Sequence, residues 1–189
     1  MTKTPWLLPR IRATQTASNV RRSFAPLLNR HTHTLIIGSM PGEASLRAKQ
    51  YYAYPRNQFW PLMHDILNNG QPCFTYQDKC GLLLTHGLGL WDSLQTCQRT
   101  GSLDSHIQTP VPNDFPFLFR QYPAIRTLLF NGQAAWRYFH KFFGKELTGK
   151  QYRVLPSTSP AHASLNYLQK KELWQQALKF ACETDVELL

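Results

Sequence analysis

The decapeptide YYAYPRNQFW (residues 51–60) groups side chains that could hold and act on a nucleic-acid base. Tyr51 and Tyr52 offer aromatic faces on which a base can stack, which contributes about 1–3 kcal/mol per base. Arg56 can contact a phosphate, and the Asn57 carboxamide can hold a water molecule or the edge of a base. Ordinary core packing is the competing interpretation for the two tyrosines.

Polar loops of the kind that approach a ligand follow two predicted strands. In GSMPG (residues 38–42), two glycines and a proline allow a sharp turn that brings backbone N–H groups close to a ligand, although a plain tight turn explains them equally well. The Asn131 carboxamide carries both a donor and an acceptor and is suited to reading a base. A helix cap or a turn residue is the alternative for Asn131.

A third loop, LPSTSPAHA (residues 155–163), is rich in hydroxyl groups. Hydroxyl and backbone N–H groups of this kind bind phosphates, so we expect this loop to contact DNA. His162 could act as an acid or as a phosphate ligand, but a surface position is the favoured interpretation of a single histidine. The expected phosphate-binding residues are therefore Arg56, Ser157, Thr158, Ser159 and His162.

These loops require strands and helices to position them. Short apolar strands are expected at residues 34–38, 88–92, 125–130 and 152–156. Helical patterns occupy residues 58–67, 75–87, 112–123, 132–143 and 165–181. Such alternation predicts an α/β fold with a parallel sheet covered by helices on both faces. Ligands of such sheets bind beyond the carboxyl ends of the strands, where the polar loops lie.

Charge and composition indicate the class of partner. The 189 residues carry a formal charge of +10, and no acid precedes Glu43, so we expect a nucleic-acid partner. Residues 1–23 are predicted to be a basic, flexible segment, with an organelle transit peptide as the alternative. No apolar run is long enough to span a membrane. The four cysteines lack CxxC spacing, which favours free thiols in a reducing compartment and no metal site.

Four segments together resemble one known family. LIIGSMPGEASL, YYAYPRNQFW, LLFNGQAAW and LPSTSPAHA occur in order, and the similarity extends over residues 24–183. They resemble the uracil-DNA glycosylase superfamily, specifically its DNA-deoxyinosine (hypoxanthine-DNA) glycosylase branch. The segment at residues 86–107 also resembles this branch.

The resemblance implies a single domain over residues 24–189, with a three-layer α/β/α sandwich and a four-stranded parallel sheet in the order 2-1-3-4. It implies a monomeric, monofunctional glycosylase that flips hypoxanthine out of DNA and hydrolyses its N-glycosidic bond without a cofactor. We expect such an enzyme in the cytoplasm, associated with the bacterial nucleoid, although organelle or nuclear targeting stays open. A uracil/thymine mismatch glycosylase and a non-catalytic nucleic-acid-binding module are the alternatives.

The resemblance also assigns roles to residues. Asn57 is expected to be catalytic and Tyr52 to stack on the flipped base, with Gly38, Ser39, Met40 and Asn131 completing the base pocket. Met40 replaces the polar residue that positions water in uracil-removing branches, and Tyr54 replaces a common histidine. The loops at 38–42 and 157–162 contain no carboxylate, which predicts a modest turnover.

A carboxamide matches the N1–H and O6 of hypoxanthine in a bidentate contact. Asn131 would need a second partner to fix its orientation, because an amide that flips would also accept adenine. The iron–sulfur cluster of some superfamily branches is not expected, because the chain lacks the close N-terminal pair of cysteines.

Overall fold

The computed structural model describes residues 19–183 and contains the predicted parallel sheet. Its strands are β2 (Thr34–Gly38), β3 (Leu88–Asp92), β6 (Thr127–Asn131) and β7 (Gln151–Leu155), in the spatial order β3-β2-β6-β7. All three neighbouring pairs are parallel. The predicted order 2-1-3-4 is confirmed, and the register aligns Gly38 at the end of β2 with Asp92 at the end of β3.

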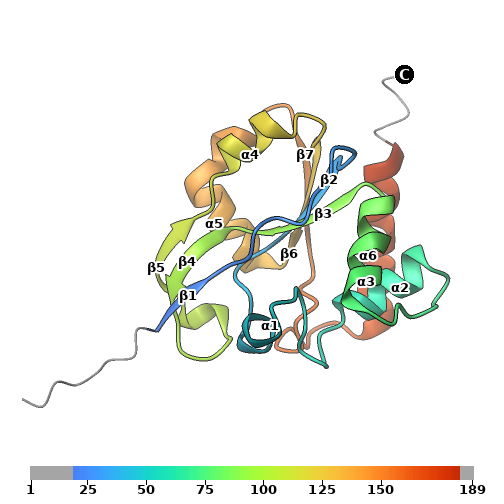
Figure 1. Cartoon of the computed structure of the whole chain (residues 1–189), viewed down its shortest axis with the longest axis horizontal. Helices are drawn as coiled ribbons and strands as arrows, with labels where there is room; N and C mark the ends of the chain where they lie inside the picture. The colour runs from blue at the N-terminus through green and yellow to red at the C-terminus, as the bar shows by residue number, and fades with distance from the viewer. Residues whose placement is uncertain (1–18, 184–189) are drawn as a thin grey trace, which may run out of the picture.

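Helices cover both faces of this sheet and form the outer layers of the α/β/α sandwich (Figure 1). Side chains of a strand alternate between faces, and β2 shows the consequence. Ile36 packs with one group of helices, whereas Leu35 and Ile37 pack with the other. The first group is α2 (Phe59–Leu67), α3 (Tyr76–Thr85) and α6 (Tyr167–Glu183), and the second is α4 (Phe115–Gln121) and α5 (Gln133–Phe143).

Local sequence signals explain where several helices begin. The Thr75 hydroxyl accepts from the Asp78 N–H while the Asp78 carboxylate accepts from the Thr75 N–H, which is a capping box. Asp114 caps α4 by accepting from the Phe117 N–H. In α6, Trp174, Ala177, Leu178 and Ala181 are buried, and Leu168 is exposed in the first turn.

A second, antiparallel sheet was not predicted. It consists of β1 (Val20–Arg22), β4 (Leu94–Gln98) and β5 (Gln108–Pro112), with β4 in the centre. Residues 20–22 therefore form a strand, whereas the sequence analysis assigned them to a flexible segment ending at residue 23. Three residues are too few to show a period, and their pairing with β4 is long-range. Residues 1–18 lie outside the described part of the chain.

Short elements complete the fold. A six-residue helix, α1 (Glu43–Ala48), follows the 38–42 loop, and two 3₁₀ turns, η1 (Asp104–His106) and η2 (Gly144–Leu147), lie in loops. Within residues 19–183, no helix has the length and apolar character needed to cross a membrane.

Candidate active site

A pocket of about 410 Å³ opens at the carboxyl ends of the parallel strands, where the sequence predicted it. Nine of the predicted site residues line it, namely Gly38, Ser39, Met40, Tyr52, Asn57, Asn131, Ser157, Thr158 and Ser159. Arg56 and His162 do not line the pocket itself. Most of the predicted site residues therefore line one pocket.

Tyr52 has the position expected of a stacking residue. One face of its ring stacks on Phe59, with ring centroids 3.9 Å apart. Its backbone adopts a left-handed conformation (φ 55°), which turns the ring into the pocket wall at a local cost in strain. Tyr51, in contrast, is a core residue whose hydroxyl donates to the Ala25 carbonyl at 3.2 Å. Of the two tyrosines, Tyr52 is the one suited to stack on a base.

The Asn57 carboxamide is held in a fixed orientation at the start of α2. Its Oδ1 accepts a hydrogen bond of 3.0 Å from the Phe59 N–H, and the backbone N–H of Asn57 donates to the Tyr54 carbonyl at 2.8 Å. Asn57 lines the pocket, and within residues 19–183 its Nδ2 makes no hydrogen bond, so this group is available to a ligand or a water molecule. A carboxamide in this state can orient a water molecule.

Thr158 fixes the orientation of Asn131, but it does so by bonding the two carboxamide atoms that would contact a base. The Asn131 Nδ2 donates to the Thr158 hydroxyl and the Thr158 N–H donates to the Asn131 Oδ1, both at 2.9 Å. The Tyr52 hydroxyl also hydrogen-bonds the Asn131 side chain. Thr158 is the second partner that we expected to fix the orientation of Asn131. However, a bidentate contact between Asn131 and hypoxanthine would need the same two carboxamide atoms that Thr158 already bonds.

The 157–162 loop is stiffened from within. The Ser157 hydroxyl accepts from the Ser159 N–H at 3.2 Å, and the Ser159 hydroxyl accepts from the Ala161 N–H at 3.3 Å. Thr158 is fully buried and bonded to Asn131, so it does not fit the predicted role of phosphate contact. Ser157, Ser159 and His162 are partly exposed and remain compatible with that role.

Arg56 lies on the surface beside the pocket. Its guanidinium donates two hydrogen bonds, of 3.0 and 2.8 Å, to the Tyr54 hydroxyl. Tyr54 thus orients an exposed cation, and it also lines the pocket. A second exposed arginine, Arg47 on α1, lines the pocket and was not singled out by the sequence analysis.

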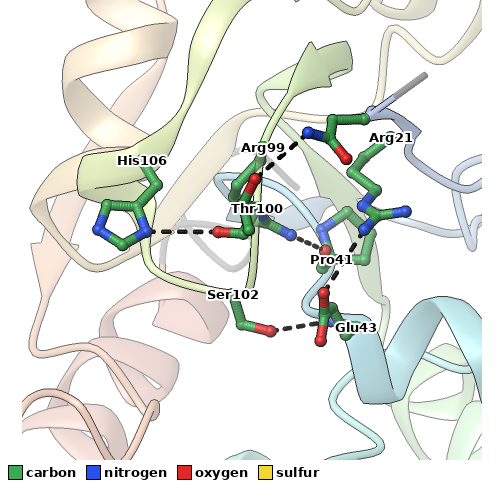
Figure 2. A network of polar contacts seen from close by, with 8 residues as sticks. Arg21, Pro41, Glu43, Arg99, Thr100, Ser102 and His106 are labelled. Atoms are coloured by element: carbon green, nitrogen blue, oxygen red, sulfur yellow. Dashed lines mark hydrogen bonds and ion pairs between the residues drawn. The ribbon is translucent and has the colours of Figure 1, made fainter. Parts of the chain in front are cut away.

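The second sheet supports the 38–42 loop from behind. Arg99, just after β4, is buried and donates to the Pro41 carbonyl (Figure 2). Ser102 accepts from the Glu43 N–H at 3.0 Å, and the Ser39 hydroxyl donates to Asp104 at 2.7 Å. Met40 packs with Leu94 and Cys97 in a small cluster of its own. Met40 is therefore a packing residue with no polar atom to offer a water molecule.

Three carboxyl groups that were not predicted for the pocket line it, and Glu43 at the start of α1 is one of them. Asp92 is the last residue of β3 and is 4% exposed, and Asp104 lies in the connection between β4 and β5. Burial, then the nearby Asp104, raise the pKa of Asp92 to about 8, and Arg99 opposes this shift. Burial also raises the pKa of Asp104. The loops at 38–42 and 157–162 contain no carboxylate, as the sequence shows, but the end of β3 brings the Asp92 carboxyl group to the same pocket.

Gly38 allows Asp92 to approach. A Cβ atom at residue 38 would lie 2.6 Å from the Asp92 Oδ1, closer than real contacts allow, and 3.5 Å from the Tyr52 hydroxyl. A side chain at this position would displace the carboxyl group from the pocket floor. The glycine predicted to permit a close ligand contact instead permits a close carboxyl contact.

No cluster of three or more His, Cys, Asp or Glu side chains suited to a metal ion occurs in the described residues. The described cysteines Cys73, Cys80 and Cys97 are free thiols. The pocket thus presents an oriented carboxamide, an aromatic face and a buried carboxyl group. Such a set can bind a planar base and position water beside it.

Comparison with known proteins defines the class. Residues 25–180 match the Uracil DNA glycosylase superfamily, and the chain belongs to that superfamily. It is 33% identical to a protein named Hypoxanthine DNA glycosylase from Methanosarcina acetivorans, over 85% of this chain and 99% of the relative. A protein of the same name from Methanosarcina barkeri is 31% identical, over 84% and 98% of the two chains.

The fold agrees with a solved structure. A solution NMR structure of a candidate uracil DNA glycosylase from Methanosarcina acetivorans superposes with a TM-score of 0.73 at 32% identity. The match covers 86% of this chain and 98% of that one. The chain is therefore a DNA glycosylase of the three-layer α/β/α type.

Proposed function

We propose that this protein is a DNA repair glycosylase that removes hypoxanthine, the deamination product of adenine, and leaves an abasic site. The observation that carries the proposal is the free, oriented Asn57 amide in the same pocket as the Tyr52 ring. The relatives named Hypoxanthine DNA glycosylase, which align over nearly their full length, support this choice of base.

The chemistry requires little from the protein beyond positioning. Cleavage of the bond between the sugar C1′ and the base passes through an oxocarbenium-like state, while negative charge develops on the departing base. Asn57 holds water below the sugar, and the pocket binds the base as that charge develops. Water adds to C1′ and loses a proton to solvent, and the base leaves with the electron pair of the broken bond.

The pocket and its surroundings suit a base flipped out of a duplex. Its volume of about 410 Å³ lies in the range of small-molecule sites, and a flipped base stacks on Tyr52. Inosine forms weaker pairs than adenine does, so flipping it costs less. We expect the flanking phosphates to contact Arg47, Arg56, Ser157, Ser159 and His162, which are exposed or partly exposed. The enzyme acts as a monomer, in a cytoplasmic compartment where it meets the chromosome.

The proposal is tested by single-turnover base release from duplexes that contain one deoxyinosine, one deoxyuridine or no lesion. Alkali converts abasic sites into strand breaks that are counted on a gel. We expect cleavage at inosine and a loss of at least about 100-fold in Asn57→Ala. Gln58→Ala, one residue further on, is the matched control for disturbance of the loop. Cleavage at uracil alone would assign a different base, and binding without any cleavage would contradict the enzyme.

A further inference from the structure

Asp92 is a buried carboxyl group of the pocket for which the catalytic proposal gives no role. It lines the pocket floor, and its Oδ2 is buried without a hydrogen-bond partner in residues 19–183. The nearest cation, Arg99, makes its ion contact of 3.8 Å with Asp104. A buried carboxyl group without a hydrogen-bond partner in the free protein can form its hydrogen bonds with a bound ligand.

The groups around Asp92 favour its neutral form. Four ionisable side chains lie near Asp92. Asp104 comes from the connection between β4 and β5, and Arg99 from the end of β4. Tyr51 and Tyr52 come from the loop before α2. Burial is the largest cause of the raised pKa, about 8, and the charge of Asp104 adds to it. At neutral pH the side chain is therefore a carboxylic acid with one O–H donor and one C=O acceptor.

That pair of groups complements the edge of hypoxanthine. The base presents its N1–H donor beside its O6 acceptor, so the acid O–H donates to O6 while N1–H donates to the acid C=O. We propose that Asp92, buried in the pocket with an unpartnered Oδ2, reads the N1–H/O6 edge of the flipped base. The inference rests on the proposed function. In this arrangement Asp92 makes the bidentate contact with the base that Asn131 cannot make, because Thr158 already bonds both polar atoms of the Asn131 carboxamide.

The ionised form would lose this match. A carboxylate still accepts from N1–H, but it places negative charge against O6 and against the charge that develops on the leaving base. Base release should therefore decrease as pH rises through the pKa of Asp92. Adenine presents an acceptor at N1 and a donor at N6, the reverse of hypoxanthine. A carboxylic acid can match this edge as well, because its proton can sit on either oxygen. Rejection of adenine therefore depends on the cost of flipping it from a stable pair and not on Asp92.

The first test is the pH dependence of single-turnover base release from the inosine duplex between pH 6 and 10. In the wild type we expect a decrease approaching tenfold per pH unit above about pH 8. Asp92→Asn keeps a donor and an acceptor at every pH, so its profile should keep only the decrease that comes from ionisation of the base. Asp104→Asn, which removes the neighbouring negative charge, should move the decrease to lower pH. Because N1–H of hypoxanthine itself ionises at high pH, Asp92→Asn also serves as the control for the substrate.

The second test varies the base. A duplex with 1-methyl-2′-deoxyinosine lacks the N1–H donor. The wild type should cleave it about 10- to 100-fold more slowly than the inosine duplex, whereas Asp92→Ala should be equally slow on both. Circular dichroism and duplex binding establish that the variants are folded, and the nearly isosteric Asp92→Asn remains informative if Asp92→Ala does not fold.

The outcomes separate the two proposals. If the wild type releases no base from any duplex, the proposed function fails, and this inference fails with it. If the wild type is active and Asp92→Ala is equally active, or if Asp92→Asn shows the same alkaline decrease as the wild type, only the role of Asp92 is overturned. A smaller decrease in Asp92→Asn than in the wild type, together with equal rates of Asp92→Ala on the two bases, would establish it.

Discussion

At the scale of single residues, the buried acid of the pocket has an energetic cost. The folded protein holds Asp92 with a pKa of about 8, whereas the unfolded chain has the ordinary value of 3.8. Between these values the unfolded state releases the proton and the folded state retains it, so the contribution of Asp92 to stability is full below pH 4 and declines up to about pH 8. This decline is the reverse of the usual carboxylate behaviour.

Replacement by the neutral isostere should reveal that cost. We expect Asp92→Asn to unfold at a higher denaturant concentration than the wild type at pH 7.5, by about 2–5 kcal/mol in the free energy of unfolding. The difference should shrink toward zero near pH 4, where the carboxyl group is neutral in both states. Urea titrations at the two pH values measure it. A pH-independent difference would mean that Asp92 is ionised in the folded protein.

The contact between Asn131 and Thr158 allows a second prediction. Thr158→Val removes the hydroxyl that accepts from the Asn131 Nδ2 and keeps the backbone N–H that donates to its Oδ1. The buried Nδ2 loses a partner, so we expect a loss of about 1–3 kcal/mol in unfolding free energy, together with slower base release. Ser159→Ala, in the same loop, is the control. Equal stabilities of the two variants would show that the Asn131 contact contributes nothing.

The residue types around the pocket were readable from the sequence, but their partners were not. Asn57, Tyr52 and Gly38 lie where their motifs placed them. Thr158 was expected to contact phosphate and is buried against Asn131, because its role depends on a partner 27 positions away. Asp92 ends a predicted strand, and only the register with Gly38 shows that it reaches the pocket.

At the scale of elements, the second sheet supports the 38–42 loop. Arg99 connects the end of β4 to the Pro41 carbonyl, and the connection between β4 and β5 carries Asp104 to Ser39. The parallel strands were predictable because each is an apolar run that ends at a turn signal. The antiparallel strands were not, because β1 is short and β5, Gln108–Pro112, contains two prolines and mostly polar or exposed positions.

Disruption of this support should slow the chemistry more than it weakens binding. In Arg99→Met the Pro41 carbonyl loses its charged donor, so the 38–42 loop is less well positioned. We expect base release to fall about tenfold, the equivalent of a hydrogen bond to a charged group, while duplex affinity changes little. Arg30→Met, at an exposed site, is the comparison. Equal single-turnover rates of the two variants would show that the loop needs no support from the second sheet.

At the scale of the whole molecule, the net charge of +10 sets how the enzyme meets DNA. Cations that contact phosphates release counterions, so the logarithm of affinity falls linearly with the logarithm of salt concentration. The three-layer core follows from the alternation of strands and helices. The placement of Arg47 and Arg56 beside the pocket mouth depends on the fold and could be assigned only from it.

Arg47→Ala and Arg56→Ala should each weaken binding to inosine-containing and to undamaged duplexes by the same factor. Each should also reduce the salt slope by about 1, since each removes about one phosphate contact. Fluorescence anisotropy over a range of salt concentrations measures both quantities. Lys141→Ala, on α5 and away from the pocket lining, is the matched control. A lesion-dependent loss would instead indicate a contact with the base.

The buried Asp92 carboxyl group of the pocket has a consequence for the energetics of damage recognition itself. If the base is read by the acid form, then at pH 9 each encounter with inosine must draw one proton from the buffer. The calorimetric enthalpy of binding should then change with the ionisation enthalpy of the buffer, with a slope approaching one proton for inosine and none for an undamaged duplex. Binding of a damaged base would thus be a proton-uptake reaction, detectable before any bond is broken.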